Sequence, residues 1–304
     1  MVFCIFYNEK GHLTLEKKDA LTLAFLAAIW GGSFLFMRVA VPDFGPIALV
    51  QLRIGIAAIF LLPLLLLKHR RKINWQHLPH YLFLGITNSA LPFCLLAYAT
   101  VYLSAGYTSL LNSSVPLWSA VVAAVWMRDW LNSWQIAGLL LGFIGVCVLV
   151  AARGSLELSG PTLAIVAAVL ATISYGVSAN YTKRYLTGSH PIVLASMSQI
   201  TAAIVLLPLT WFYWPTGTIS QTSWVNVFLL GSVCTAFAYI LFYGLIARVG
   251  PTKTVTVTFL VPVFAMSWGA LILQEAITLP MIIGCIIILS GTALVTGIIG
   301  RKSL

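Results

Sequence analysis

An internal repeat covers most of this chain. The segment Ala57-Ala-Ile-Phe-Leu-Leu-Pro63 returns as Ala202-Ala-Ile-Val-Leu-Leu-Pro208, at an offset of 145 and with one substitution. Further pairs at this offset are Gly31 with Gly176, Ser33 with Ser178, Arg38 with Lys183, and Pro46 with Pro191. After a one-residue slip, an offset of 146 pairs Leu84-Gly85 with Leu230-Gly231, Val115-Pro116 with Val261-Pro262, Asp129 with Glu275, Gly138 with Gly284, and Gly145 with Gly291. Such a repeat in an apolar chain predicts two similar membrane halves around a shared centre.

The composition places the chain in a lipid bilayer. Apolar residues make up 60% of its 304 residues and charged residues only 8%, against roughly a quarter charged in soluble domains. The net charge of +10 does not call for a nucleic-acid partner, because cationic loops are what orient a membrane protein. The apolar start at 2–7 is shorter than a signal-peptide core and precedes the charges, so no cleaved signal is predicted.

The apolar stretches predict an all-α integral membrane protein with ten transmembrane helices. Taking about 20 residues for each crossing, we place the helices at 20–41, 46–67, 78–99, 104–126, 134–152, 160–182, 191–214, 223–246, 251–274 and 278–299. The domain boundaries that follow are a leader at 1–19, a first five-helix repeat at 20–152, a second at 160–299 and a tail at 300–304.

Lysine and arginine decide the predicted orientation. With a cytoplasmic N-terminus, the outer loops hold only Arg153. The inner segments then hold Lys10, Lys17, Lys18, Lys68, Arg70, Arg71, Lys72, Arg128, Lys183, Arg184, Arg248, Lys253, Arg301 and Lys302. The positive-inside rule therefore places both termini in the cytoplasm. Because five is odd, the second repeat enters the bilayer upside down, and the halves form an inverted repeat.

Several motifs recur in order along both halves. The first half has Ile29-Trp-Gly-Gly-Ser33, Arg38, Leu52-Arg53, Val115-Pro116, Asp129 and Gly138; the second has Val261-Pro262, Leu273-Gln-Glu275 and Gly284 through Gly291. Together with the tandem repeat, this chain resembles the EamA-like permeases of the drug/metabolite transporter superfamily over about 20–299. It departs from their usual Gly-Glu pair, with Arg128-Asp129 in the first repeat and Gln274-Glu275 in the second.

The resemblance implies what the residues alone do not. Such permeases mostly move small metabolites, many of them amino acids or related compounds, often outward across the plasma membrane. We therefore expect a multi-pass permease of a bacterial inner membrane with a small-molecule substrate. The mechanism expected from the repeats is alternating access, in which one half rocks against the other around a central cavity.

Two arginines and a lysine fall within or at the ends of spans. Arg53 lies well inside the second span, where a cation costs about 2.5–3.5 kcal/mol on insertion scales. It either attracts a substrate carboxylate or phosphate, caps backbone carbonyls, or pairs with Glu275. Arg38 and its repeat partner Lys183 lie near opposite membrane faces, which suits gating or snorkelling.

No acidic residue falls in the middle of a span. A proton-coupled carrier of cations normally needs such a buried carboxylate, so the sequence disfavours cationic substrates and a carboxylate proton relay. It favours facilitated diffusion, or coupling to the substrate's own gradient. Asp129 and Glu275 sit where helices turn, and we expect them to act as gates, helix caps or loop ion pairs.

Uncharged polar and aromatic residues form the predicted binding cavity. They cluster on spans that are repeat partners, and Pro116 and Pro262 weaken two of these spans, freeing carbonyls or permitting bending. The alternative for each Ser or Thr is a hydrogen bond to its own helix. The predicted substrate-binding residues are Asn88, Tyr98, Asn112, Ser113, Trp118, Tyr175, Tyr239, Thr256 and Arg53.

Glycine is frequent in the fifth and tenth spans. Gly138, Gly142, Gly145, Gly284 and Gly291 lie near four-residue spacing, which permits close helix packing or a homodimer through these helices. The dispersed cysteines show no metal or disulfide spacing, and the histidines all lie in the leader or loops. No metal or cofactor is predicted.

Two other classes of function fit this sequence less well than a permease does. A membrane-embedded enzyme needs His, Asp, Glu or a catalytic dyad at depth, and the deep positions offer none. A non-transporting sensor would bind a ligand without flux, and it would need a soluble domain through which to signal. We therefore expect no enzymatic activity.

Overall fold

The computed structural model describes residues 16–152 and 160–298, and within these ranges every element is a helix. Residues 1–15 of the predicted leader, Arg153 and the predicted tail at 300–304 lie outside the described residues. The elements are α1 (Lys17–Leu64), η1 (Leu65–His69), η2 (Arg70–Lys72), η3 (Trp75–His77), α2 (Leu78–Gly85), η4 (Ile86–Ala90), α3 (Leu91–Tyr102), α4 (Ala105–Asn112), α5 (Val115–Trp126), α6 (Ser133–Ala151), α7 (Gly160–Tyr185), α8 (Pro191–Phe212), α9 (Gln221–Gly231), η5 (Ser232–Phe237), α10 (Ala238–Val249), α11 (Pro251–Val255), α12 (Val257–Leu273) and α13 (Leu279–Val295).

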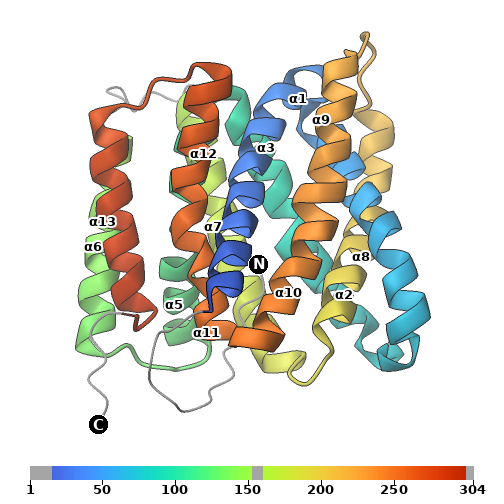
Figure 1. Cartoon of the computed structure of the whole chain (residues 1–304), viewed down its shortest axis with the longest axis horizontal. Coiled ribbons are helices and arrows are strands. Elements are labelled where there is room, and N and C mark those ends of the chain that lie inside the picture. Colours follow the sequence, from blue (N-terminus) through green and yellow to red (C-terminus); the bar gives the residue numbers. More distant parts are fainter. Residues whose placement is uncertain (1–15, 153–159, 299–304) are drawn as a thin grey trace.

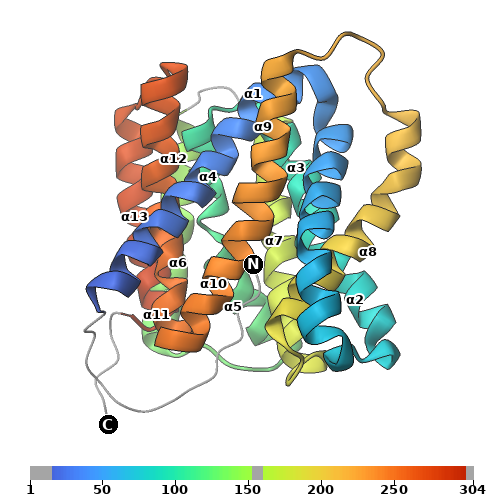
Figure 2. The same cartoon turned by 45° about the vertical axis from the view of Figure 1, so that its right-hand side comes forward.

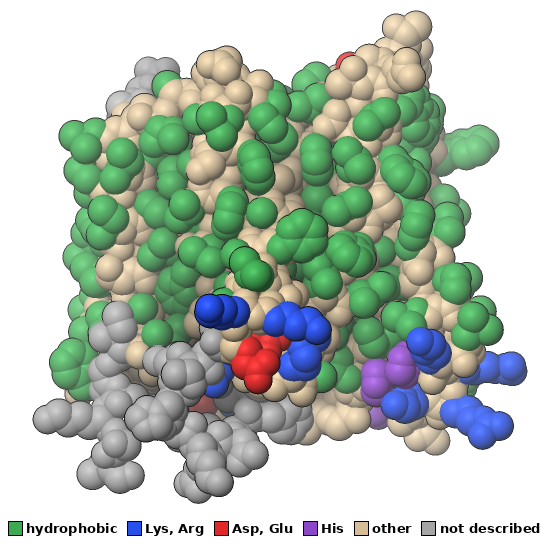
Figure 3. All heavy atoms as spheres, in the orientation of Figure 1, with side chains coloured by type: hydrophobic (Ala, Val, Ile, Leu, Met, Phe, Trp, Pro, Cys, Tyr) green, Lys and Arg blue, Asp and Glu red, His purple; other side chains and the backbone are tan. Residues whose placement is uncertain are grey.

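Consecutive helices join into stretches that are long and apolar enough to cross a membrane. Eight stretches meet that description in the described ranges, and α13 is apolar but shorter. The bundle in Figure 1 has these helices side by side, roughly parallel to one direction. In the face shown by Figure 3, apolar side chains cover a broad band and the Lys and Arg side chains gather at its lower end. This distribution is that of a multi-pass membrane protein.

The longest helix, α1, is two arms joined at Gly45. This glycine has φ 69° and ψ 165°, a backbone conformation that residues other than glycine rarely adopt, and Pro42 and Pro46 lie on either side of it. Figures 1 and 2 show α1 rising to a turn and then descending, so that its two arms are antiparallel. The predicted spans 20–41 and 46–67 correspond to the two arms, which are connected by this single turn rather than by a polar loop.

The repeat reappears as close contacts between the two halves. The backbone at Gly31 lies so near α12 that a Cβ there would sit 2.7 Å from Phe264 Cβ and 2.8 Å from Ala265 N. Its repeat partner Gly176 lies equally near α5, where a Cβ would sit 2.9 Å from Ser119 N. Because Ser119 and Ala265 are themselves related by the offset of 146, the same contact occurs twice with the halves exchanged.

A second pair of contacts follows the same rule. A Cβ at Gly85 of α2 would lie 2.9 Å from Ala202 N on α8, and one at Gly231 of α9 would lie 2.8 Å from Arg53 O on α1. Gly85 and Gly231 are repeat partners, as are the segments they touch. Glycine therefore marks the places where helices of one half meet helices of the other.

The glycine-rich helices α6 and α13 pack against each other within one chain (Figure 1). A Cβ at Gly291 would lie 2.5 Å from Gly142 N and 2.6 Å from Gly138 O. The predicted close packing of these helices is therefore present inside the monomer. A homodimer through the same helices stays a prediction.

The departure from the usual Gly-Glu pair has a conformational cost. Arg128 and Gln274, which are repeat partners, have φ of 55° and 54°, in the left-handed region. Gln274 follows the last residue of α12 there, a position where glycine is usual. We expect Gln274→Gly to raise the unfolding free energy by about 0.5–1 kcal/mol, measured by denaturant titration in detergent. Gln221→Gly, in the first turn of α9, is the control and should destabilise; a loss at both positions would contradict the argument.

Candidate functional site

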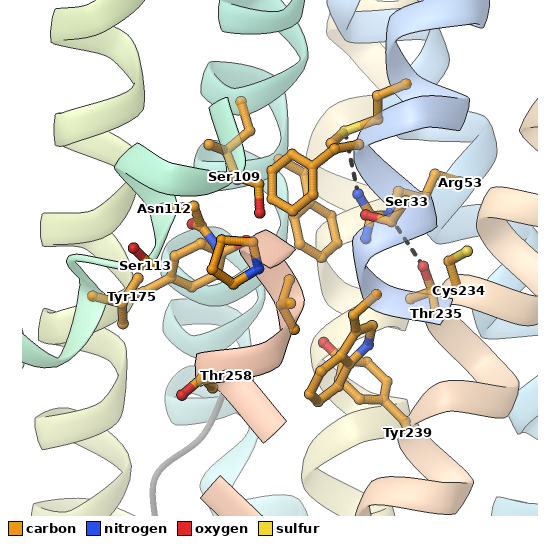
Figure 4. Close-up of a pocket in the computed structure, with 18 of the residues that line it drawn as sticks. Ser33, Arg53, Ser109, Asn112, Ser113, Tyr175, Cys234, Thr235, Tyr239 and Thr258 are labelled. Atoms are coloured by element: carbon orange, nitrogen blue, oxygen red, sulfur yellow. Dashed lines mark hydrogen bonds between the residues drawn. The ribbon is translucent and has the colours of Figure 1, made fainter. Parts of the chain in front are cut away.

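A cavity of about 100 Å³ lies between the helices, and both repeats contribute to its wall (Figure 4). From the first repeat, residues of α1, α3, α4 and α5 line it, and from the second repeat, residues of α7, η5, α10 and α12. Most of the lining is apolar or aromatic, including Trp30, Phe34 and Phe93. The predicted site residues that line it are Arg53, Asn112, Ser113, Pro116, Tyr175, Tyr239 and Pro262.

The cavity lies beside interruptions in the helices. α4 ends at Asn112 and α5 begins at Val115, while α11 and α12 are separated at Thr256. Pro116 lies in the first turn of α5, directly after the first interruption, whereas its repeat partner Pro262 lies inside α12, six residues after Thr256. Each proline lacks a backbone donor. Ser113 Oγ donates to Leu110 O over 2.6 Å, so a side chain supplements the local backbone bonding. Discontinuous helices of this kind are where transporters commonly bind their substrates.

Two π-helical turns stand at equivalent places in the halves. η4 and η5 begin at residues related by the offset of 146, Ile86 and Ser232. Cys234 and Thr235 of η5 line the cavity. Such turns are rare and frequently mark functional sites, because the wider turn moves side chains out of regular helical register.

Arg53 is the charged residue on the cavity wall. Its side chain is 5% exposed, and its Nε donates to Thr235 Oγ1 over 3.0 Å. Its Nη1 lies 3.5 Å from Met37 Sδ, and its guanidinium carbon lies 3.8 Å from the centre of the Phe93 ring. All these partners are uncharged. Glu275, considered above as its ion-pair partner, is instead paired with Arg38.

Two polar atoms on another part of the wall have no hydrogen-bond partner within the described residues. These are Asn112 Oδ1 and Ser109 Oγ, both buried and both from α4. Buried polar atoms are nearly always paired, and these line the cavity, so a molecule inside it would complete their bonding. Sequence reasoning missed Ser109, although it lies one helical turn before Asn112 and therefore on the same face.

Four of the predicted substrate-binding residues lie outside the lining of this cavity. Asn88 is buried within η4, and Tyr98 has its ring 5.4 Å from the Tyr102 ring. Trp118 packs edge-on against Phe143 at 4.9 Å. Thr256 Oγ1 donates to Lys253 O over 2.6 Å, which is the local bonding that the sequence left open. Thr258, two residues on, lines the cavity instead.

The gate candidates form two ion pairs, each between the halves. Arg38 Nε lies 3.9 Å from Glu275 Oε1, and Lys183 Nζ lies 3.7 Å from Asp129 Oδ2. Arg38 and Lys183 are repeat partners, and so are the two carboxylates. Arg38 Nη1 also donates to Thr100 O and Val101 O at the end of α3.

The two pairs differ in their surroundings. The Glu275 side chain is 16% exposed and accepts the Ala105 N–H at the start of α4 over 3.0 Å. The Asp129 side chain is 65% exposed. Within the described ranges, no group of three or more His, Cys, Asp and Glu side chains could hold a metal ion.

Comparisons with known proteins agree with this architecture. The EamA-like transporter family matches at residues 18–151 and again at 162–297. A protein of Archaeoglobus fulgidus named "Uncharacterized transporter" is 26% identical over 91% of this chain and 98% of its own length. A protein of Escherichia coli named "Probable amino-acid metabolite efflux pump" is 24% identical over 95% of this chain and 98% of its own. A solved crystal structure superposes with a TM-score of 0.63 at 18% identity, covering 93% of this chain and 98% of that one, which shows a shared fold.

Proposed function

Because this chain belongs to the EamA-like transporter family, we propose that it carries small metabolites, amino acids or related compounds, outward across the plasma membrane. The observation that carries the proposal is the cavity at the helix interruptions, whose wall is built from both repeats. Transport would use alternating access, with one half rocking against the other around that cavity.

The architecture we propose is ten crossings arranged as two inverted five-helix repeats with both termini in the cytoplasm. The turn at Gly45 supports the count, because it divides α1 into two antiparallel arms. The exchanged glycine contacts and ion pairs support the inversion, since a two-fold relation between the halves generates each contact twice. The Lys and Arg side chains at one end in Figure 3 would face the cytoplasm.

The function is tested by counterflow. Proteoliposomes holding purified protein are loaded with single unlabelled amino acids, and uptake of a trace labelled amino acid is followed with and without an imposed pH gradient. Of the described residues that line the cavity, none is acidic, so we expect saturable exchange that ignores the gradient. Exchange driven by the gradient would contradict uncoupled transport, and binding without exchange would favour a sensor.

Asn112→Leu tests whether the cavity is the route. The substitution removes the buried Oδ1 that has no protein partner, and losing a hydrogen bond to a ligand there should slow counterflow about tenfold. Asn226→Leu is the matched control, because Asn226 Nδ2 donates to Thr222 O on α9, away from the lining. Equal loss in both variants, at equal protein incorporation, would show that the effect is not specific to the cavity.

A further inference from the structure

Arg53 leaves the cavity with an uncompensated positive charge. It is the one charged side chain among the described residues that line the cavity, and protein covers it almost completely. A buried cation is costly to hold unless an opposite charge lies beside it. The hydroxyl of Thr235, the sulfur of Met37 and the ring of Phe93 supply polar and polarisable contacts but no negative charge.

Four carboxylates in the described ranges form hydrogen bonds or ion pairs with groups other than Arg53. Asp19 is paired with Arg248, and Asp43 accepts from Ser220. The other two are Asp129 and Glu275, in the ion pairs with Lys183 and Arg38. None of these carboxylates lines the cavity. A lipid phosphate is an unsuitable partner for Arg53, because Arg53 is buried and not exposed at the protein surface.

The unsatisfied atoms of α4 lie across the cavity from this charge. Figure 4 shows Ser109 and Asn112 on one side and Arg53 with Thr235 on the other. A ligand between them meets a guanidinium at one end, and at the other an amide oxygen and a hydroxyl that lack partners. Trp30 and Phe34 add apolar surface to the cavity wall.

We infer that the cavity binds small organic monocarboxylates, with the carboxylate on the Arg53 guanidinium. This inference deepens the proposed function and rests on it for transport, although binding can be measured separately. A guanidinium offers two parallel N–H donors to a carboxylate, the strongest geometry for this pair. A monoanion neutralises the cavity, a zwitterion leaves its ammonium group to be held by uncharged acceptors, and a cation repels Arg53. The preferred substrates are therefore net anionic acids rather than amines.

The test is a ligand series of nearly constant shape. Binding of 3-methyl-2-oxobutanoate, valine and valinamide to the purified wild-type protein in detergent is measured by isothermal titration calorimetry at pH 7. The first is an anion, the second a zwitterion, and the third keeps the valine skeleton with an amide in place of the carboxylate. We expect the anion to bind about tenfold more tightly than valine, and valinamide not to bind measurably.

Variants at Arg53 separate charge from geometry. Arg53→Gln should weaken binding of both acids at least a hundredfold, whereas Arg53→Lys should weaken it about tenfold, because lysine keeps the charge without the fork. Arg71→Gln removes the same charge from an exposed position and should leave binding unchanged. Size-exclusion elution of each variant verifies that it remains folded, and the wild-type ligand series tests the inference even if Arg53→Gln does not fold.

The outcomes distinguish the carboxylate site from the proposed transport function. Valinamide binding as tightly as valine, unchanged binding in folded Arg53→Gln, or no binding of either acid to the wild type would overturn the carboxylate site. Counterflow of other metabolites in those cases would leave the permease standing. Conversely, tight binding of the acids with no flux of any of them would support the site and contradict transport.

Discussion

Gly31→Ala is expected to lower the unfolding free energy by about 3 kcal/mol, whereas the same change at the adjacent Gly32 should be nearly neutral. The new Cβ at Gly31 would meet Phe264 Cβ at 2.7 Å, Ala265 N at 2.8 Å and Val261 O at 3.0 Å. Two of these atoms are backbone, so the contact is relieved only by moving α1 away from α12. Overpacking of a close-packed interior typically costs about 1–3 kcal/mol, and rigid neighbours place this position at the upper end.

Gly32 supplies a control one residue away. A Cβ there would meet only side-chain atoms, the nearest being Phe36 Cε2 at 3.8 Å, which is ordinary contact. Denaturant unfolding in detergent, followed by circular dichroism, compares the two variants. Gly176→Ala, the repeat partner, should behave like Gly31→Ala, because its Cβ would lie 2.9 Å from Ser119 N. Equal stability of Gly31→Ala and Gly32→Ala would contradict the packing of α1 on α12.

The loss at Gly31 should extend to transport. Val261, one of the residues that a Cβ at Gly31 would displace, lines the cavity together with Ser33 and Phe34 of α1. Separating the helices there would change the shape of the site, so counterflow should fall more in Gly31→Ala than in Asn112→Leu.

The repeat made the fold largely predictable. Glycines related by 145 or 146 residues mark helix crossings because only glycine allows two backbones so close, and the contacts of Gly31 and Gly176 have this cause. The turn at Gly45 falls between the predicted spans 20–41 and 46–67, because Pro42 and Pro46 mark the ends of two apolar stretches. Helix ends elsewhere moved by a few residues, as expected for boundaries that packing decides.

The site was only partly predictable, for reasons visible in single residues. Asn112 and Ser113 could be found because polar groups in apolar helices need a partner. Thr258 lines the cavity and Thr256 does not, because the helix is interrupted at Thr256 and a regular helical period does not carry across such a break. The partner of Glu275 is Arg38 rather than Arg53, and sequence separation could not distinguish these arginines. The internal repeat could have distinguished them. Arg38 and Lys183 are repeat partners, as are Glu275 and Asp129, and Arg38 pairs with Glu275 just as Lys183 pairs with Asp129.

Glu275→Ala is expected to lower the unfolding free energy by about 2–3 kcal/mol, whereas Asp129→Ala should cost about 1 kcal/mol or less. Both Glu275 oxygens accept the Ala105 N–H at the start of α4, and Arg38 lies beside them. Removing the carboxylate leaves a part-buried helix N-terminus without its acceptor and Arg38 without its counter-charge. The free-energy cost of both losses together exceeds that of losing a helix cap alone. Asp129 and Lys183 are both well exposed, and exposed pairs contribute about 0–1 kcal/mol.

The difference between these repeat partners has a mechanical consequence. Arg38 and Glu275 line a pocket with Pro42 and Gly45, at the end of the bundle where the arms of α1 meet (Figure 1). Their network connects α1, α3, α4 and the residues after α12, so we expect it to hold that end of the bundle together more firmly than the exposed pair of Asp129 and Lys183 holds its own surroundings. Denaturant unfolding of both alanine variants, with Glu275→Gln as the variant that keeps one acceptor oxygen, measures this asymmetry. Glu275→Gln should recover part of the loss through the Ala105 bond. Similar costs for Glu275→Ala and Asp129→Ala would mean that burial does not set the strength of the two pairs, and the unequal closure would have to be abandoned.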